Sequence, residues 1–299
     1  MEFSKPGSIA AERPRARVGA AYSALVGWGA RAPLPSALRG LAYRAFARAV
    51  GANLDEVEGD LAGYASLGDF FARKLRHGAR VVDTAPGAVI SPCDGVVAAR
   101  GAAVAGALVQ AKGRTYRLAE LVADGELAAR LTGGPYETIY LSPRDYHRVH
   151  APVAGRVLGY DYLPGSLWSV NPRVAARRDG VIARNERVVI RMHAGALGRV
   201  AVVMVGAGGV GNIRLAPALG GGDSAQWRKA REPRRVELAG VELAQGDELG
   251  AFRLGSTVVL VFEPDRVELA GEVGDAVRFG QRLGRTTAPD QGPEGVGAA

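Results

Sequence analysis

The second part of the chain consists of short runs of β-branched and aromatic residues, each closed by glycine, proline or aspartate. This texture starts at Gly87, in a sequence that holds 42 glycines and 16 prolines. Runs this short favour strands over helices, and the closing residues are those of tight turns. We therefore predict a glycine-rich, mostly β body. Its clearest strands are expected at 88–90, 136–141, 187–192, 200–205 and 257–262.

The first 85 residues have a helical pattern instead. Residues 35–50 are expected to form a helix that stops before Gly51. Its apolar residues share one face with arginines beside them, which suits a helix at a membrane interface. A helix docked on its own protein, with the arginines in water, would show the same pattern, so both interpretations stay open. The face comprises Leu38, Leu41, Ala42, Ala45, Phe46 and Ala49, flanked by Arg44 and Arg48 on one side and Arg39 on the other.

These patterns together predict an α+β fold, in which a small N-terminal helical lobe precedes a mostly β, glycine-rich domain. We place the lobe at residues 1–85 and the β-rich domain at 86–287. Residues 288–299, rich in glycine and proline, are expected to be a flexible tail. The aromatic pair Phe70 and Phe71 is expected to be part of the core.

Charge and cysteine content narrow the classes of partner and site. Residues 1–50 carry eight basic and two acidic side chains, most of the formal net charge of +8. Such an arm suits an anionic surface, membrane or nucleic acid, although a solvated terminus would look the same. The single cysteine, Cys93, excludes an internal disulfide and a multi-cysteine metal site. The uncharged stretch 18–30 is shorter than the roughly 20 residues of a membrane span, and we expect it to be peripheral.

A serine close to the C-terminus is placed to attack its own backbone. Ser256 follows Gly255 at the entrance of the apolar run 258–262, just after the turn-forming run 244–250. Glycine accepts backbone angles that other residues do not, so the Ser256 hydroxyl can fold back onto the Gly255 carbonyl. That attack needs a base, and the base needs an orienting acid.

Histidines and one aspartate supply candidates for these roles. Two of the four histidines, His147 and His150, lie in the segment 141–152, and a spacing of three puts both on one side of a helical turn. A zinc site is not indicated, because no glutamate follows the first histidine as in the helical metalloprotease motif. A purely structural histidine pair remains the alternative. Asp94 is the candidate acid, although Asp94-Gly95 between apolar residues is also a hairpin-turn pattern.

Three familiar enzyme classes do not fit. Residues 206–211 match the G-x-G-x-x-G pattern, but a proline and a triple glycine follow within 212–222, so no dinucleotide-binding helix is expected. The Gly-x-Ser-x-Gly elbow of serine hydrolases is absent from the sequence. A pyridoxal enzyme needs a Schiff-base lysine, and of four lysines only Lys112 lies in a motif-like segment, 110–116. If amine chemistry occurs here, its carbonyl comes from elsewhere.

These motifs together resemble those of the phosphatidylserine decarboxylases, pyruvoyl enzymes of membrane lipid synthesis. The Leu-Gly-Ser-Thr sequence at 254–257 is similar to the self-cleavage site of that family, and the other blocks follow in family order between about residues 64 and 263. Residues 205–213 depart from the family, which more often has polar residues in place of Gly208 and Gly209. The first 60 residues match loosely. The other blocks are 91–95, 110–116, 146–152, 164–172 and 183–187.

The resemblance implies a mechanism and assigns its residues. Asp94 would hold His150 in the right tautomer, and His150 would deprotonate Ser256 for attack on Gly255. β-Elimination would release residues 1–255 and leave dehydroalanine at position 256, which hydrolyses to a pyruvoyl cofactor. Its ketone would form a Schiff base with the serine amine of the lipid and accept the electrons released with carbon dioxide. His147 would return a proton to the carbanion, and no metal would take part.

The resemblance also implies partners and a location. We expect an anionic phospholipid membrane surface and a phosphatidylserine substrate, with the two cleavage fragments staying associated and no nucleic acid bound. A homodimer is left open. The arginine and alanine richness suggests a G+C-rich bacterial genome, which would place a peripheral membrane protein on the cytoplasmic face of the inner membrane.

Three alternatives remain open at this point. The chain could decarboxylate a different serine-headed lipid, or be a non-catalytic membrane-binding β-domain whose Gly255-Ser256 turn stays intact. It could also be a lipid hydrolase that uses Ser256 without cutting itself. Self-cleavage distinguishes these alternatives. A decarboxylase of another lipid would cut itself, whereas the non-catalytic domain and the hydrolase would stay intact.

Overall fold

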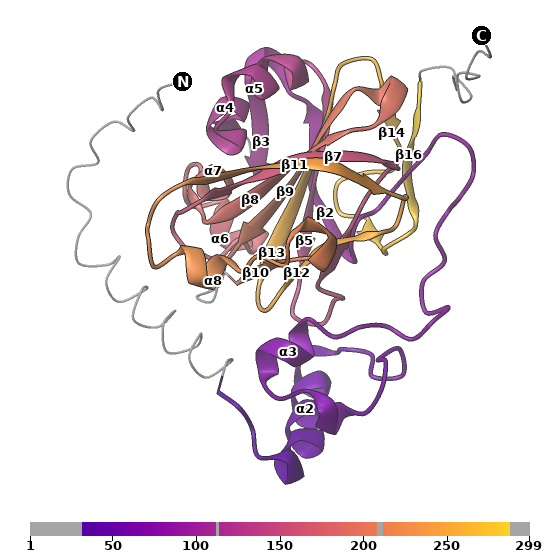
Figure 1. The fold of residues 1–299 in the computed structure, drawn as a ribbon, viewed down its shortest axis with the longest axis vertical. Coiled ribbons are helices and arrows are strands. Elements are labelled where there is room, and N and C mark those ends of the chain that lie inside the picture. The colour runs from indigo at the N-terminus through magenta and orange to yellow at the C-terminus, as the bar shows by residue number, and fades with distance from the viewer. Residues whose placement is uncertain (1–31, 112–113, 208–211, 288–299) are drawn as a thin grey trace.

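A computed structural model describes residues 32–111, 114–207 and 212–287. The predicted peripheral stretch 18–30, Lys112 and the tail 288–299 lie outside these residues. Figure 1 shows a sheet-rich body with a small helical lobe at one end, so the expected α+β fold with a mostly β domain is confirmed.

One antiparallel sheet of eight strands forms the centre of the body, in the order β11-β7-β8-β9-β13-β5-β2-β15 (Figure 1). All five runs predicted as strands lie in strands, because β-branched residues fit the pleated, buried surface of a sheet. The bounds are β2 Gly95–Ala102, β5 Pro135–Leu141, β7 Gly155–Leu163, β8 Arg187–His193, β9 Arg199–Gly206, β11 Arg234–Leu243, β13 Ser256–Phe262 and β15 Ala276–Val277.

Smaller elements cover the two faces of this sheet. Three short sheets have the strand orders β1-β16-β14, β10-β12-β6 and β3-β4. Their strands are β1 Ala88–Ile90, β3 Ala107–Ala111, β4 Arg114–Arg117, β6 Arg148–His150, β10 Ile213–Leu215, β12 Glu248–Phe252, β14 Val267–Leu269 and β16 Arg282–Thr286. The short helices of the body are α4 Leu118–Val122, α5 Gly125–Leu131, α6 Pro172–Ala175, α7 Val181–Arg184 and α8 Ser224–Trp227, with single 3-10 turns at η2 Val104–Gly106, η3 Gly195–Leu197 and η4 Pro217–Leu219.

Strand β13 shows how the sheet separates two hydrophobic cores. Side chains alternate across a strand, so Val258 and Leu260 pack on one face and Val259 and Val261 on the other. The first core includes residues of β6 and β12, and the second includes residues of α4, α5 and α7. Every residue of β13 is buried. The strand that starts at Ser256 is therefore fixed on both faces and both edges.

The helical lobe is built from α2 Ser36–Val50, η1 Leu61–Gly63 and α3 Leu67–Phe71. The predicted helix is confirmed, and it ends because Gly51 adopts a left-handed conformation with φ 76°. Tyr43 stacks on Phe70 with ring centroids 4.8 Å apart, which confirms the aromatic pair as core. In the part of the chain that the structure describes, no helix is long and apolar enough to cross a membrane.

The single apolar face predicted for α2 is divided in the structure. Phe46 turns inward onto Phe71, with ring centroids 5.4 Å apart, whereas Leu38 and Leu41 are 54% and 70% exposed. The helix docks instead through Tyr43 and Ala47. Docking on the protein and exposure of an apolar face thus occur together, on different sides of one helix.

Candidate active site

Ser256 is the first residue of β13 and lies at the centre of the main sheet. It pairs with Leu141 of β5 on one side and Gly206 of β9 on the other, and its side chain is fully buried. The expected entrance of a buried strand is therefore confirmed. A serine hydroxyl in such a place needs a hydrogen-bond partner.

His147 is the partner of Ser256 in the structure. The distance from His147 Nδ1 to Ser256 Oγ is 3.1 Å, and His147 Nε2 lies 3.0 Å from the Ser142 carbonyl oxygen. A carbonyl can only accept, so Nε2 carries the proton and donates it to Ser142. Nδ1 then has a free lone pair and accepts the hydrogen bond of the Ser256 hydroxyl. This tautomer is the one in which an imidazole can take the proton of a nucleophile.

The turn before His147 fixes that tautomer. Asp145 Oδ2 accepts hydrogen bonds from the backbone N–H and the hydroxyl of Ser142, both at 2.7 Å. Arg73 holds the same turn from the lobe, because its Nη2 donates to the carbonyl oxygens of Arg144 and Asp145. The group that orients His147 is therefore the backbone carbonyl of Ser142. Asp145 acts on His147 only indirectly, by holding Ser142 in place.

Burial keeps His147 neutral. The side chain is fully buried, and the loss of hydration lowers the pKa of His147 to about 3, with the nearby Arg73 guanidinium acting in the same direction. The ring also lies against Phe71 of the lobe, with centroids 4.9 Å apart. At neutral pH the imidazole is therefore an available proton acceptor in a buried site.

His150 lies in different surroundings. Its Nδ1 donates to the Gly246 carbonyl oxygen at 2.8 Å, and its Nε2 accepts from the Tyr146 hydroxyl at 3.0 Å. The ring stacks on Phe279 with centroids 3.8 Å apart. Burial lowers the pKa of His150 to about 4. Both ring nitrogens are thus occupied, and within the described residues no hydrogen bond joins His150 to Ser256.

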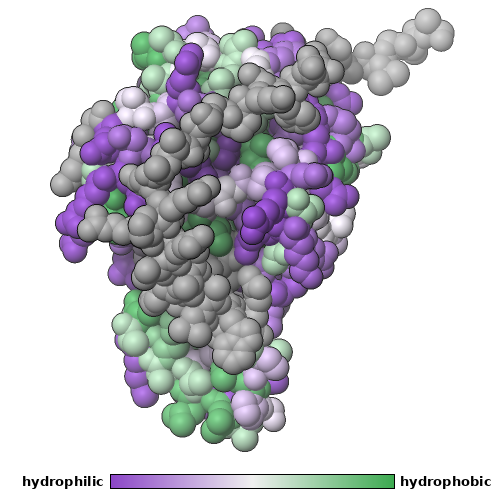
Figure 2. All heavy atoms as spheres, turned by 90° about the vertical axis from the view of Figure 1, so that its left-hand side faces the viewer, coloured by the Kyte–Doolittle hydropathy of each residue, from purple (hydrophilic) through white to green (hydrophobic). Residues whose placement is uncertain are grey.

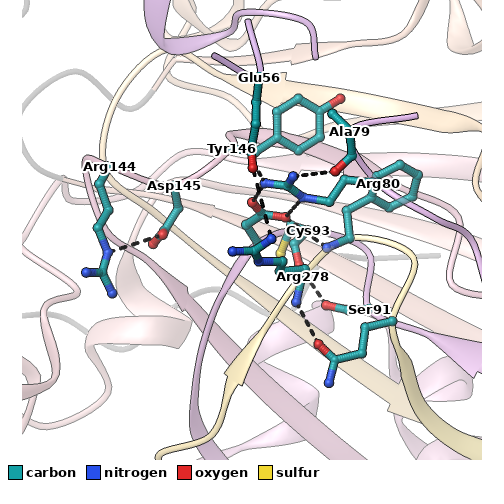
Figure 3. A network of polar contacts seen from close by, with 12 residues as sticks. Glu56, Ala79, Arg80, Ser91, Cys93, Arg144, Asp145, Tyr146 and Arg278 are labelled. Atoms are coloured by element: carbon teal, nitrogen blue, oxygen red, sulfur yellow. Dashed lines mark hydrogen bonds and ion pairs between the residues drawn. The ribbon is translucent and has the colours of Figure 1, made fainter. Parts of the chain in front are cut away.

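Asp94 is held in an ion-pair network by Arg80, which Figure 3 shows together with Glu56 and Ala79. It accepts from Arg80 Nε at 3.0 Å and from the backbone N–H of Phe279 at 2.9 Å. Arg80 also donates to Glu56 at 2.8 Å and to the Ala79 carbonyl oxygen at 2.7 Å. Among the described residues Asp94 and His150 share no hydrogen bond. They are connected through Phe279, which is bonded to Asp94 by its backbone and stacked on His150 by its ring.

Two expectations about this region are wrong. His147 and His150 do not share one side of a helical turn, because residues 148–150 form strand β6, paired with β12. In extended chain a spacing of three points side chains to opposite sides, and so the two rings meet different neighbours. Asp94 and Gly95 do not form a hairpin turn either, since β1 and β2 belong to different sheets.

The strand before the G-x-G-x-x-G pattern lies in an antiparallel sheet, whereas dinucleotide-binding proteins carry this pattern in a parallel βαβ unit. Gly206 ends a strand of an antiparallel sheet, and the described chain resumes in another strand, β10. Gly208 and Gly209 lie outside the described residues. The described part of the chain contains no group of three or more His, Cys, Asp or Glu side chains arranged to hold a metal ion.

Several residues at the site were not identified from the sequence. Asp145 and Tyr146 stand beside the histidines, and that proximity was the available signal. Phe71 and Arg73 reach the site from the lobe, which only the tertiary fold determines. The backbone N–H of Ala207, which donates to the Gly255 carbonyl oxygen at 3.0 Å, has no side-chain signature at all.

Comparison with known proteins shows a family match that spans these residues. The family model described as phosphatidylserine decarboxylase matches residues 67–285, which include all the residues above from Phe71 to Phe279. A phosphatidylserine decarboxylase proenzyme of Anaeromyxobacter sp. (strain K) is 43% identical over 276 residues, 91% of this chain and 94% of the relative. The proenzyme of Myxococcus xanthus (strain DK1622) is 40% identical over 89% of this chain and 94% of its own length. That of Acinetobacter baylyi is 38% identical over 84% and 87%.

Proposed function

The chain belongs to the phosphatidylserine decarboxylase family, and we propose on this basis that it is a proenzyme that cuts itself between Gly255 and Ser256 and then decarboxylates phosphatidylserine to phosphatidylethanolamine. The observation that carries the proposal is the contact between two atoms: His147 Nδ1, which has a free lone pair, lies 3.1 Å from Ser256 Oγ. A buried serine with a neutral base in contact, directly after a glycine, is equipped to attack its own preceding carbonyl.

The cleavage follows from these positions. His147 takes the Ser256 hydroxyl proton while Oγ bonds to the Gly255 carbonyl carbon, and the amide becomes an ester when the Gly255–Ser256 bond breaks. The freed amine takes the proton back from His147. Loss of the Ser256 Cα proton to a base and cleavage of the Cβ–Oγ bond then free Gly255 as a carboxylate and leave dehydroalanine at position 256, which water hydrolyses to the pyruvoyl group with release of ammonia. We assign the base to His147 because of its contact with Ser256, in place of the predicted His150. Asp94 and His150 become residues that position this region.

The same arrangement suits the second reaction. A pyruvoyl group derived from Ser256 supplies a carbonyl that withdraws the electrons left by the departing carboxylate. The position fits such a group because residue 256 is buried, is paired with a strand on both edges and has the neutral His147 in contact. His147 remains beside it and returns the proton. Residues 256–299 stay bound to the larger fragment, since β13 lies between β9 and β5 and β16 pairs with β1.

Release of carbon dioxide from lipid vesicles tests the proposed reaction. Purified protein is mixed with vesicles that contain phosphatidylserine labelled at its carboxyl carbon, with Ser256→Ala as the control. We expect labelled carbon dioxide from the unmodified protein and none from the variant. Free fatty acid as the product would favour the hydrolase alternative. A cut chain that leaves phosphatidylserine unchanged would contradict the assigned substrate and point to another serine-headed lipid.

The helical lobe is the proposed membrane contact. Figure 2 shows apolar side chains gathered at the end of the molecule that Figure 1 identifies as α2 and α3. Leu38 and Leu41 are exposed there, with the exposed Arg44 and Arg48 on the same helix. An exposed apolar edge with adjacent arginines suits the surface of an anionic bilayer. We place the protein peripherally on the cytoplasmic face of the inner membrane.

Vesicle sedimentation with matched variants tests this contact. We expect Leu41→Asp to weaken binding to anionic vesicles by about tenfold, because it places a charge on the surface that enters the bilayer. Val104→Asp is the control, since Val104 is 69% exposed but lies on the body. Arg39 is unsuitable as a test, because it donates to the Leu34 and Ala62 carbonyl oxygens within the lobe. Equal binding by both variants would contradict the proposed face.

A further inference from the structure

The main-chain segment Gly206–Ala207 touches the bond that the proposed reaction breaks. Its Ala207 N–H donates to the Gly255 carbonyl oxygen at 3.0 Å. Both Ala207 and Ser256 are buried, with at most 1% of their surface exposed. The segment belongs to the glycine-rich run whose dinucleotide pattern has no use in this fold. The hydrogen bond to Gly255 points to a different chemical role for this segment.

We propose that the Ala207 N–H is the oxyanion donor of self-cleavage; the inference rests on the proposed function and deepens it. When Ser256 Oγ bonds to the Gly255 carbon, the carbonyl electrons move onto its oxygen, and the Ser256 proton moves to His147. Collapse of that oxyanion breaks the Gly255–Ser256 bond, and the freed amine takes the proton back from His147. A donor already aimed at the oxygen stabilises the charge as it forms. In a buried site the effect is larger than in solution.

The sheet places this donor in advance. Ser256 pairs with Gly206 in the β9–β13 ladder, and the Ala207 bond is the next one in the same register. The donor therefore costs no rearrangement at the moment of reaction. Its partner is the carbonyl that precedes Ser256, whose hydroxyl is in contact with His147. This separates its role from that of an ordinary ladder bond.

Asn185 holds the other end of the same peptide unit. Its Nδ2 donates to the Gly206 carbonyl oxygen at 3.0 Å, and the side chain is fully buried. Asn185 is itself fixed by the backbone of Trp168, through one bond at 2.8 Å and one at 3.2 Å. Hydrogen bonds in line polarise one another, so a donor on the Gly206 oxygen strengthens the Ala207 N–H as a donor. Asn185 is thus a positioning residue for the oxyanion donor.

Replacement of Ala207 by lactic acid tests the donor without changing the side chain. The backbone ester, introduced by nonsense suppression in cell-free synthesis, removes one N–H and keeps the methyl group. The control is the same replacement at Ala201, which is buried in the same strand and removes an N–H far from Gly255. Precursor loss is followed by intact mass, and folding is checked by thermal melting. We expect the Ala207 ester to cleave about 100-fold more slowly than the Ala201 ester.

Equal cleavage rates for the two esters would overturn the proposal. Failure of the unmodified chain to cleave would instead overturn the proposed function. Asn185→Ala provides a second measurement if the Ala207 ester does not fold. We expect it to slow cleavage about tenfold. Where the ester does fold, the combined change should cleave little more slowly than the ester alone, because both changes act on one peptide unit. A folded Asn185→Ala chain that cleaves at the unmodified rate would contradict the positioning role.

Discussion

His147 and His150 lie three residues apart, but their surroundings differ in the one feature that matters for proton transfer. His147 has a ring nitrogen in contact with Ser256, whereas both nitrogens of His150 are engaged by Tyr146 and Gly246. Both rings are buried and neutral. Burial and pKa alone therefore do not distinguish a reacting histidine from one that holds the structure. The direction of the hydrogen bonds does, because it shows which nitrogen is free to accept a proton.

Removal of His147 should have the largest effect. The residue contacts position 256 before cleavage and remains beside it afterwards, so both reactions lose their proton acceptor or donor. We expect His147→Ala to slow cleavage strongly and to lower decarboxylation per cut chain by about 1000-fold. Cut and uncut chains are counted by intact mass, and carbon dioxide release is divided by the cut fraction. A cut His147→Ala chain with normal turnover would show that His147 is not the proton donor or acceptor.

Removal of His150 should affect cleavage but spare the second reaction. His150 connects Tyr146 to the Gly246 turn, and its loss would shift His147 relative to Ser256. We expect His150→Ala to slow cleavage about tenfold to 100-fold, while turnover per cut chain stays within a few-fold. The two histidine variants are measured side by side. If His150→Ala never cleaves and His147→Ala cleaves normally, the sequence-based assignment of His150 as the base is the right one.

Asp94 should contribute mainly to stability and alignment. The carboxylate is paired with Arg80 in a buried network, so Asp94→Asn leaves the guanidinium without its full countercharge. We expect a loss of about 3 kcal/mol in the free energy of unfolding, measured by urea denaturation in the uncut Ser256→Ala background. Glu268→Gln is the control, because its ion pair with Arg285 is exposed and should cost less than about 1 kcal/mol. Equal losses would show that the Asp94 network is not structural.

The last expected effect is a pH dependence of stability. The pKa values of folded His147 and His150, about 3 and 4, lie below the usual value of 6.5. Below pH 6.5 the unfolded chain binds protons that the folded chain does not, so the free energy of unfolding falls as the pH falls toward 4. The slope is at most about 1.4 kcal/mol per pH unit for each histidine. In the uncut background His150→Gln should flatten it, whereas His77→Gln, at an exposed histidine, should not.

Local patterns account for the parts of the fold that could be predicted from the sequence. The β-branched run 257–262 is a strand in any β-rich fold, and Gly51 ends α2 for a local reason. That β13 lies between β9 and β5 depends on pairing between residues at least 50 positions apart, which no local pattern encodes. The same distinction between local pattern and tertiary fold applies to the residues of the site. Ser256, Gly255, His147 and Asp94 stood in recognisable motifs, whereas the pairing of Asp94 with Arg80 and of Ser256 with His147 follows from the fold.

The most direct test of this account is an intact mass spectrum of the purified protein under denaturing conditions. The account predicts two fragments that meet at Gly255 and Ser256, with the smaller one, residues 256–299, blocked by a pyruvoyl group at its first residue. A single unmodified chain of 31.1 kDa, persisting after prolonged incubation of folded protein, would contradict it.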